Sequence, residues 1–215
     1  MNSAMASKQE RVEAVMRAAP VIAVVVIEDA KAAVPMARAL VAGGIPAIEI
    51  TLRTPAAIEA IRLIAAEVEG AIVGAGTVLS AADLNAAEKA GSRFAVSPGA
   101  TDQLLEAAQH SALPLLPGIA TASEAMRLIE RGFRFAKCFP ASAVGGAALL
   151  RALSSPLPQL RFCPTGGITP QNASEYLALP NVLCVGGSWM TPANLLREGN
   201  WREVEAQARG AAQLK

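Results

Sequence analysis

Short runs of apolar residues recur along the chain, separated by longer and more polar segments. The runs begin near Val21, Pro46, Ala71, Arg93, Leu113, Phe133, Leu160 and Val182, so they follow one another at intervals of roughly 20 to 27 residues. A short apolar run bounded by turn residues is typical of a strand that is buried on both faces of a parallel sheet. The pattern therefore predicts eight short strands.

The segments between the runs carry apolar residues at the i, i+3, i+4 spacing of an amphipathic helix, for example at 32–41, 56–64 and 122–129. Several of these segments also begin or end with capping residues. The expected helix starts are the Thr-Pro pairs at 54–55, 169–170 and 191–192, Ser80, Thr101, and a capping box of Thr121 with Glu124, and the expected helix ends are Gly91 and Gly132. The sequence thus predicts strands that alternate with helices.

Eight β-α repeats without a Pro-, Gly- or Ser-rich linker predict one α/β domain over residues 1–215, a (β/α)8 TIM barrel. Residues 1–19 form an extension, in which 7–19 has the apolar spacing of an extra N-terminal helix that covers the base of the barrel. The main alternative is an open doubly wound sheet. That fold favours a glycine-rich first turn, and 74–79 lacks the third glycine of the dinucleotide-binding motif.

Composition excludes several classes of function. The chain has 215 residues, a net charge of +1 and no basic stripe, so nucleic acid is not an expected partner. The first apolar run is too short to cross a membrane and no signal peptide precedes it, so we expect a cytoplasmic protein with no membrane partner and reduced cysteines. His110 is the only histidine, which argues against a multi-histidine metal site.

Lys137 lies in an apolar run, 133–140, that otherwise has the pattern of a buried strand ending at a proline. Alternation along a strand directs it to the same face as Phe135 and Phe139. Burial disfavours the charged form of an amine, and a neutral amine is what a Schiff-base nucleophile requires. The alternative is a lysine on an edge strand whose ammonium group reaches water.

Other chemistry-bearing residues lie at the carboxyl ends of the predicted strands, where active sites of such barrels are found. The second strand ends with Glu49, Thr51 and Arg53 on one face. Glycine pairs follow the last two strands, at 166–167 and 186–187, where backbone N–H groups can approach a phosphate closely.

An amine, a carboxylate, an arginine and a phosphate site fit carbonyl chemistry on a phosphorylated 2-keto acid. Lys137 would attack the keto group and form a Schiff base, while Glu49 would move the protons. Arg53 would hold the substrate carboxylate, because a guanidinium group matches the geometry of a carboxylate.

Six motifs in this order resemble the family of 2-keto-3-deoxy-6-phosphogluconate (KDPG) aldolase: 49–54, 74–78, 97–99, 137–141, 163–167 and 186–189. This is the class I aldolase family of the Entner–Doudoroff pathway, and many members also cleave 4-hydroxy-2-oxoglutarate. The resemblance implies pyruvate as a product, no metal or cofactor, and a homotrimer. It implies Lys137 as the Schiff-base lysine and Glu49 as the general acid and base, and it gives the substrate-binding residues as Arg53, Thr77, Pro98, Phe139, Thr165, Gly166, Gly167, Gly186, Gly187 and Ser188.

One position departs from the family pattern. Ser142 follows Ala141, where the family usually has a glutamate. The lysine and the carboxylate are in place, so we expect the change to affect substrate preference rather than the reaction class.

Three other functions fit parts of the pattern. The substrate could be the galactonate epimer, or mainly 4-hydroxy-2-oxoglutarate. A phosphate-binding barrel isomerase or epimerase is a second alternative, although the metal-dependent kind needs several histidine and aspartate ligands. A non-catalytic sugar-phosphate binding protein, in which Lys137 is only a binding cation, is the third.

Overall fold

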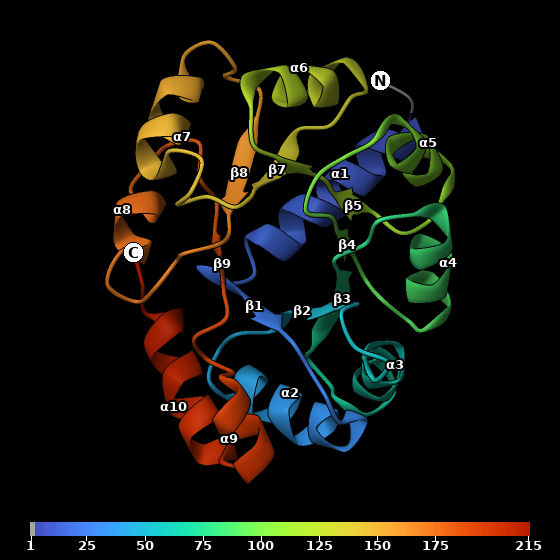
Figure 1. Ribbon diagram of the computed structural model, residues 1–215, viewed down its shortest axis with the longest axis vertical. Helices are drawn as coiled ribbons and strands as arrows, with labels where there is room; N and C mark the ends of the chain where they lie inside the picture. The colour runs from blue at the N-terminus through green and yellow to red at the C-terminus, as the bar shows by residue number, and fades with distance from the viewer. Residues whose placement is uncertain (1–2) are drawn as a thin grey trace.

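The computed structural model describes residues 3–215, in which parallel strands form a curled sheet with helices around it (Figure 1). The strands are β1 (Val21–Val25), β2 (Ala47–Thr51), β3 (Ile72–Gly76), β4 (Ala95–Val96), β5 (Leu115–Leu116), β6 (Gly118–Ile119), β7 (Phe135–Cys138), β8 (Arg161–Pro164) and β9 (Val185–Gly187). All eight apolar runs contain strand residues, and the fifth run is divided into β5 and β6 at Pro117. Met1 and Asn2, the first residues of the predicted domain, lie outside the described residues.

The strands pair in parallel, largely in chain order. Six of them form one sheet in the order β5-β4-β3-β2-β1-β9, and three form a second sheet in the order β6-β7-β8. Two isolated bridges, Phe162 with Val182 and Thr165 with Gly186, connect β8 to the segment of β9. A doubly wound sheet reverses its strand order near the middle. The order β1 to β5 has no such reversal, so the alternative of a doubly wound sheet is wrong.

Helices pack around the curled sheet, and in the view of Figure 1 α1 crosses the middle of the ring of strands. They are α1 (Ser3–Met16), the 3-10 helix η1 (Ala30–Ala32), α2 (Ala33–Ala42), α3 (Ala57–Glu67), α4 (Ala81–Lys89), α5 (Asp102–His110), α6 (Ala122–Glu130), α7 (Gly146–Ser154), α8 (Ala173–Leu177), α9 (Ala193–Glu198) and α10 (Trp201–Ala212). The helix expected at 7–19 therefore begins and ends earlier, as α1.

The predicted helix caps have a mixed outcome. Ser80 and Thr101 cap α4 and α5, and Thr121 forms the expected capping box with Glu124 at the start of α6. The Thr-Pro starts are wrong, because α3, α8 and α9 begin one to three residues beyond the predicted prolines. At the first of these sites, the Thr54 hydroxyl donates to the Ile27 carbonyl instead of capping α3.

Alternation along the strands divides the core into an outer and an inner part. Ile48 and Ile50 of β2 belong to the large cluster that also contains Ile61 and Ile64 of α3. The residues between them point the other way, so the sequence directs Glu49 to the inner face of the curled sheet.

Side chains of α1 fill one end of the interior of the curled sheet. Val12 and Met16 form an inner apolar cluster with Phe94, Phe135 and other strand residues. In Figure 1, α1 crosses the ring of strands. Apolar side chains therefore fill one end of the interior and leave the polar strand ends at the other.

Candidate active site

Lys137 and Glu49 form a buried ion pair inside the curled sheet. The Lys137 Nζ atom lies 3.0 Å from Glu49 Oε1 and 3.5 Å from Oε2. Only 5% of the lysine side chain and 4% of the glutamate side chain are exposed. Lys137 also lies beside an aromatic ring, with Nζ 5.3 Å from the ring centre of Phe139. The alternative of an edge-strand lysine that reaches water is therefore wrong.

The neighbouring backbone makes room for this pair. Gly76 lies on β3 beside Glu49, and a Cβ atom at Gly76 would overlap the Glu49 carboxylate. Gly118 of β6 is in register with Lys137. A Cβ atom at Gly118 would overlap the backbone of Pro98. Gly76 therefore leaves space for the Glu49 carboxylate, and Gly118 lets the Pro98 backbone approach the strand beside Lys137.

Arg53 and Thr77 form a second polar contact, with Arg53 Nε donating to Thr77 Oγ1 at 3.1 Å. Thr77 is the one non-glycine residue with a positive φ in the described chain, at 56°. A β-branched residue in the left-handed region is strained and indicates a position that the surrounding structure fixes. A strained threonine that holds a guanidinium group is consistent with a preformed site for a carboxylate.

A cavity of about 550 Å³ opens above the ion pair. Eight of the twelve predicted site residues line it: Arg53, Lys137, Phe139, Thr165, Gly166, Gly167, Gly186 and Ser188. Glu49 and Thr77 are outside the lining but contact Lys137 and Arg53, respectively.

Two predicted residues lie behind the cavity wall rather than in it. Pro98 packs with its backbone against Gly118, one strand away from Lys137. Gly187 belongs to β9, and a Cβ atom there would overlap the ring of Trp189. Gly187 thus gives Trp189 its place in the wall.

Other residues of the wall were missed by the sequence analysis. They are Val24, Val26, Ile168, Trp189, Thr191, Pro192 and Ala193. Applying the strand-end rule to the first strand would have found Val24 and Val26, but apolar residues at a strand end carry no chemical signal. The residues from 191 to 193 were interpreted as the start of a helix.

The end of the cavity away from Lys137 is built from the loops that follow β8 and β9. Gly166 and Gly167 have φ values of 97° and 75°, which favour glycine. Thr165 is buried against Gly186, and a Cβ atom at Gly186 would overlap the Thr165 hydroxyl group. Ser188 is exposed at this end, so its hydroxyl is available to a bound molecule.

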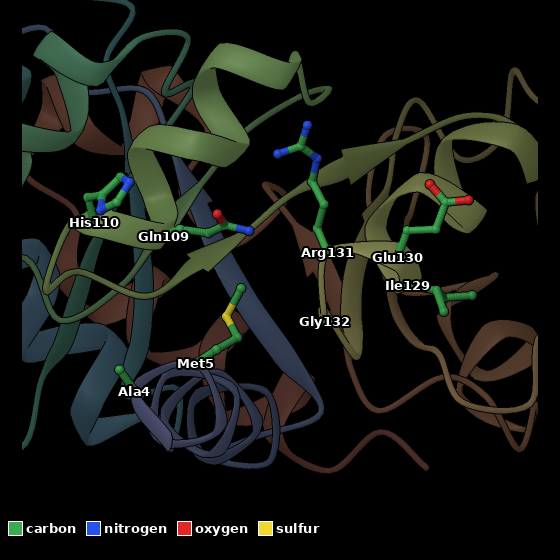
Figure 2. Close-up of a pocket in the computed structure, with 8 residues that line it drawn as sticks. All are labelled: Ala4, Met5, Gln109, His110, Ile129, Glu130, Arg131 and Gly132. Carbon is green, nitrogen blue, oxygen red and sulfur yellow. The ribbon is translucent and has the colours of Figure 1, made fainter. Parts of the chain in front are cut away.

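A larger cavity, of about 640 Å³, lies elsewhere, between α1 and the ends of α5 and α6 (Figure 2). Figure 2 shows His110 and Glu130 on opposite sides of this region, and no lysine lines it. Arg131, the most prominent charge there, is already paired with Asp102 at 2.9 Å. The chemistry therefore points to the smaller cavity with the Lys137–Glu49 pair.

The three cysteines are free and buried close to the site. Burial, with the nearby Cys163 thiol, raises the pKa of Cys138 to about 11. A hydrogen bond with Cys163, followed by burial, raises the pKa of Cys184 well above its usual value. Thiols of this kind are poor nucleophiles at neutral pH, which leaves Lys137 as the candidate nucleophile of this site.

Within residues 3–215, no group of three or more His, Cys, Asp or Glu residues comes together as a metal site. No helix in the same range is long and apolar enough to cross a membrane.

The fold and the site define a class of α/β proteins that carry a buried lysine–carboxylate pair at the carboxyl ends of parallel strands. Residues 12–207 match the model of the KDPG and KHG aldolase family, and the chain belongs to this family. It is 50% identical over 201 residues to the KHG/KDPG aldolase of Escherichia coli strain K12, covering 94% of each chain. It is 52% identical over 199 residues to the 2-dehydro-3-deoxy-phosphogluconate aldolase of Dickeya dadantii, covering 93% of each.

Solved structures of relatives support the same family. A KDPG aldolase from Legionella pneumophila, with pyruvate captured at low pH as a covalent carbinolamine intermediate, is 46% identical with a TM-score of 0.91, over 94% of this chain and 98% of that one. The aldolase of Zymomonas mobilis ZM4 with 3-phosphoglycerate is 47% identical with a TM-score of 0.91, over 96% and 97%. A native KDPGal structure is less similar, at 28% identity and a TM-score of 0.79, over 89% and 91%.

Proposed function

We propose that this chain is a class I aldolase that cleaves 2-keto-3-deoxy-6-phosphogluconate to pyruvate and glyceraldehyde 3-phosphate, and that it also cleaves 4-hydroxy-2-oxoglutarate. The observation that carries the proposal is the distance of 3.0 Å between Lys137 Nζ and Glu49 Oε1 in a buried site. The Legionella relative with its captured pyruvate carbinolamine supports the same chemistry.

The reaction begins with proton transfer from the Lys137 ammonium to Glu49, which frees the amine lone pair. The amine attacks C2 of the keto acid to form a carbinolamine. Glu49 returns its proton to the carbinolamine hydroxyl group, and loss of water gives a cationic Schiff base and a Glu49 carboxylate. Glu49 then removes the proton of the C4 hydroxyl group. The C3–C4 bond breaks, its electron pair moves into the Schiff base to form an enamine, and the aldehyde leaves. Protonation of the enamine at C3 and hydrolysis release pyruvate and restore the lysine.

Arg53 and Thr77 bind the carboxylate next to the keto group. The guanidinium group supplies charge and paired N–H donors, and its contact with Thr77 fixes its orientation before substrate arrives. Phe139 and Thr165 shape the pocket around the reacting carbons, and Pro98 supports it through Gly118. This arrangement fixes which carbonyl carbon faces Lys137.

Gly166, Gly167, Gly186 and Ser188 bind the phosphate group at the far end of the cavity, with Gly187 supporting Trp189 beside them. The Zymomonas relative, solved with a phosphorylated three-carbon acid, supports a phosphate site in this family. The chain is closer in sequence to the KDPG aldolases than to the KDPGal protein, which favours the gluconate over the galactonate substrate.

The single-domain (β/α)8 barrel remains our interpretation of the architecture. It is supported by the parallel pairing from β1 to β5, the continuation of β5 into β6, and the bridges between β8 and β9. The inner apolar cluster supports α1 as the extra helix at the base of this barrel.

We also propose a cytoplasmic homotrimer. Three buried, unpaired cysteines are typical of a reducing compartment. Leu79 and Met126 are 61% and 53% exposed in a single chain, which supports their burial in an assembly. Light scattering should give about three times the chain mass of 22.1 kDa, and a monomer mass would contradict the trimer.

Borohydride reduction in the presence of pyruvate tests the proposed function. The expected result is one covalent label per chain, on Lys137, located by peptide mapping. Lys137→Ala should lose both the label and turnover, whereas Lys89→Ala, a change at the exposed end of α4, should keep both. A label on Lys31 or Lys89 with Lys137 unmodified would remove Lys137 from its role.

A further inference from the structure

The loop that follows β7 is hydrogen-bonded along the loop that follows β8. Ala141 N donates to the Thr165 carbonyl at 2.8 Å, and Ser142 N donates to the Gly166 carbonyl at 3.1 Å. The Ser142 hydroxyl then donates to the Gly167 carbonyl at 3.1 Å. Two residues next to the strand of Lys137 thus bind three successive carbonyl groups of the glycine loop.

The Gly167 carbonyl accepts a second side-chain hydrogen bond, from Asn172 Nδ2 at 2.9 Å. The Ser142 Oγ atom also lies 3.4 Å from the hydroxyl oxygen of Tyr176, which is 4% exposed. Because the serine proton is directed at Gly167, the Tyr176 hydroxyl donates to Ser142. The chain from Tyr176 through Ser142 to Gly167 has one consistent direction of donation.

These bonds determine where the amide groups of the loop point. In a trans peptide the carbonyl and the following N–H are antiparallel. The Gly167 and Ile168 N–H groups therefore point away from Ser142, and both residues line the cavity. Neither N–H group donates a hydrogen bond within residues 3–215. The packing is close, since a Cβ atom at Gly167 would overlap the Ser142 hydroxyl.

We propose that Ser142 is a positioning residue for the anion-binding end of the cavity. It holds the Gly167 carbonyl away from the cavity, together with Asn172, so that the Gly167 and Ile168 N–H groups face the phosphate. A Gly167 carbonyl that pointed into the cavity would repel the phosphate group. The inference rests on the proposed function for the identity of the anion, and the contacts of Ser142 with the loop carry it.

The test compares Ser142→Ala with Ser142→Thr, which keeps the hydroxyl on an exposed side chain, and with Ser154→Ala. Ser154 is a matched control, because its hydroxyl bonds only to Arg151 within α7 and lies outside the cavity lining. The measurements are kcat and KM for the phosphorylated six-carbon substrate and for 4-hydroxy-2-oxoglutarate. The affinity for inorganic phosphate is measured separately by calorimetry.

Ser142→Ala should raise KM for the phosphorylated substrate and Kd for inorganic phosphate by about 3- to 10-fold, the effect of one hydrogen bond. Its kcat, and its KM for 4-hydroxy-2-oxoglutarate, should match those of the wild type. Ser142→Thr should restore phosphate affinity, and Asn172→Ala should change it in the same direction as Ser142→Ala.

Unchanged phosphate affinity in Ser142→Ala, or an equal loss on both substrates, would overturn the positioning role. Wild-type protein that binds no inorganic phosphate would overturn it as well. Failure of the proposed function has a different signature, which is the absence of pyruvate labelling on Lys137. Phosphate binding is measured without turnover, so it decides the role of Ser142 even in that case.

Discussion

Glu49→Gln separates proton transfer from the shape of the site. The two side chains have nearly the same volume, and the amide oxygen can still accept a hydrogen bond from Lys137. The amide cannot accept a proton at neutral pH, so the C4 hydroxyl loses its base. We expect kcat for the phosphorylated substrate to fall by roughly 10²- to 10⁴-fold, or about 2.7 to 5.4 kcal/mol of transition-state stabilisation.

The same change also affects stability, because it leaves a buried amine without a counter-ion. An unpaired buried ammonium at 5% exposure would cost about 3–5 kcal/mol. The variant should therefore unfold at a lower temperature than the wild-type protein.

The assay is steady-state turnover, with thermal unfolding of each variant measured at neutral pH. Glu59→Gln is a matched control, since Glu59 is an exposed helical glutamate that pairs with Arg62. It should leave kcat unchanged and lower the stability far less than Glu49→Gln does. A Glu49→Gln enzyme with near-normal kcat would refute the role of Glu49 as the base. A Glu49→Gln protein as stable as the wild type would refute the argument about the unpaired amine.

Two further predictions concern the ends of the cavity. Ser188→Asp should sharply reduce cleavage of the phosphorylated substrate and affect cleavage of 4-hydroxy-2-oxoglutarate much less, because the new carboxylate repels the phosphate. Ser188→Ala controls for loss of the hydroxyl group. Equal losses of activity on both substrates would contradict the phosphate assignment. Because burial raises the pKa of Cys138 to about 11, and that of Cys184 is also raised, neither thiol should react with iodoacetamide in the native protein at pH 8. Mass spectrometry should detect both labels only after unfolding, and rapid native labelling would contradict the buried positions.

The sequence correctly predicted that Glu49 and Lys137 share the interior of the curled sheet, because the position of each side chain depends on local alternation. Strand periodicity directs Glu49 and Lys137 to the same interior, and no competing interaction changes that face. The Thr-Pro helix starts failed for the opposite reason. At 54–55 a tertiary hydrogen bond from Thr54 to Ile27, two residues beyond the first strand, replaces the local cap.

The wall of the cavity was harder to predict than its chemistry. Trp189 reaches the wall only because Gly187 leaves space for its ring, and no sequence pattern encodes such a pairwise fit. Ser142 was visible in the sequence only as a departure from the family pattern. Its role depends on where the Gly167 carbonyl lies after folding, which is a property of two loops far apart in the chain.

The apolar cluster between α1 and the strands has a kinetic consequence. With Met16 and Phe135 filling one end of the interior, the substrate and both products share a single opening. Lys137 lies at the inner end and Ser188 is exposed at the outer one. In the proposed mechanism the phosphorylated aldehyde forms nearer the exit while the pyruvate carbons are still bonded to Lys137. The expected order of release is therefore aldehyde first, and in the reverse direction pyruvate is expected to enter before the aldehyde.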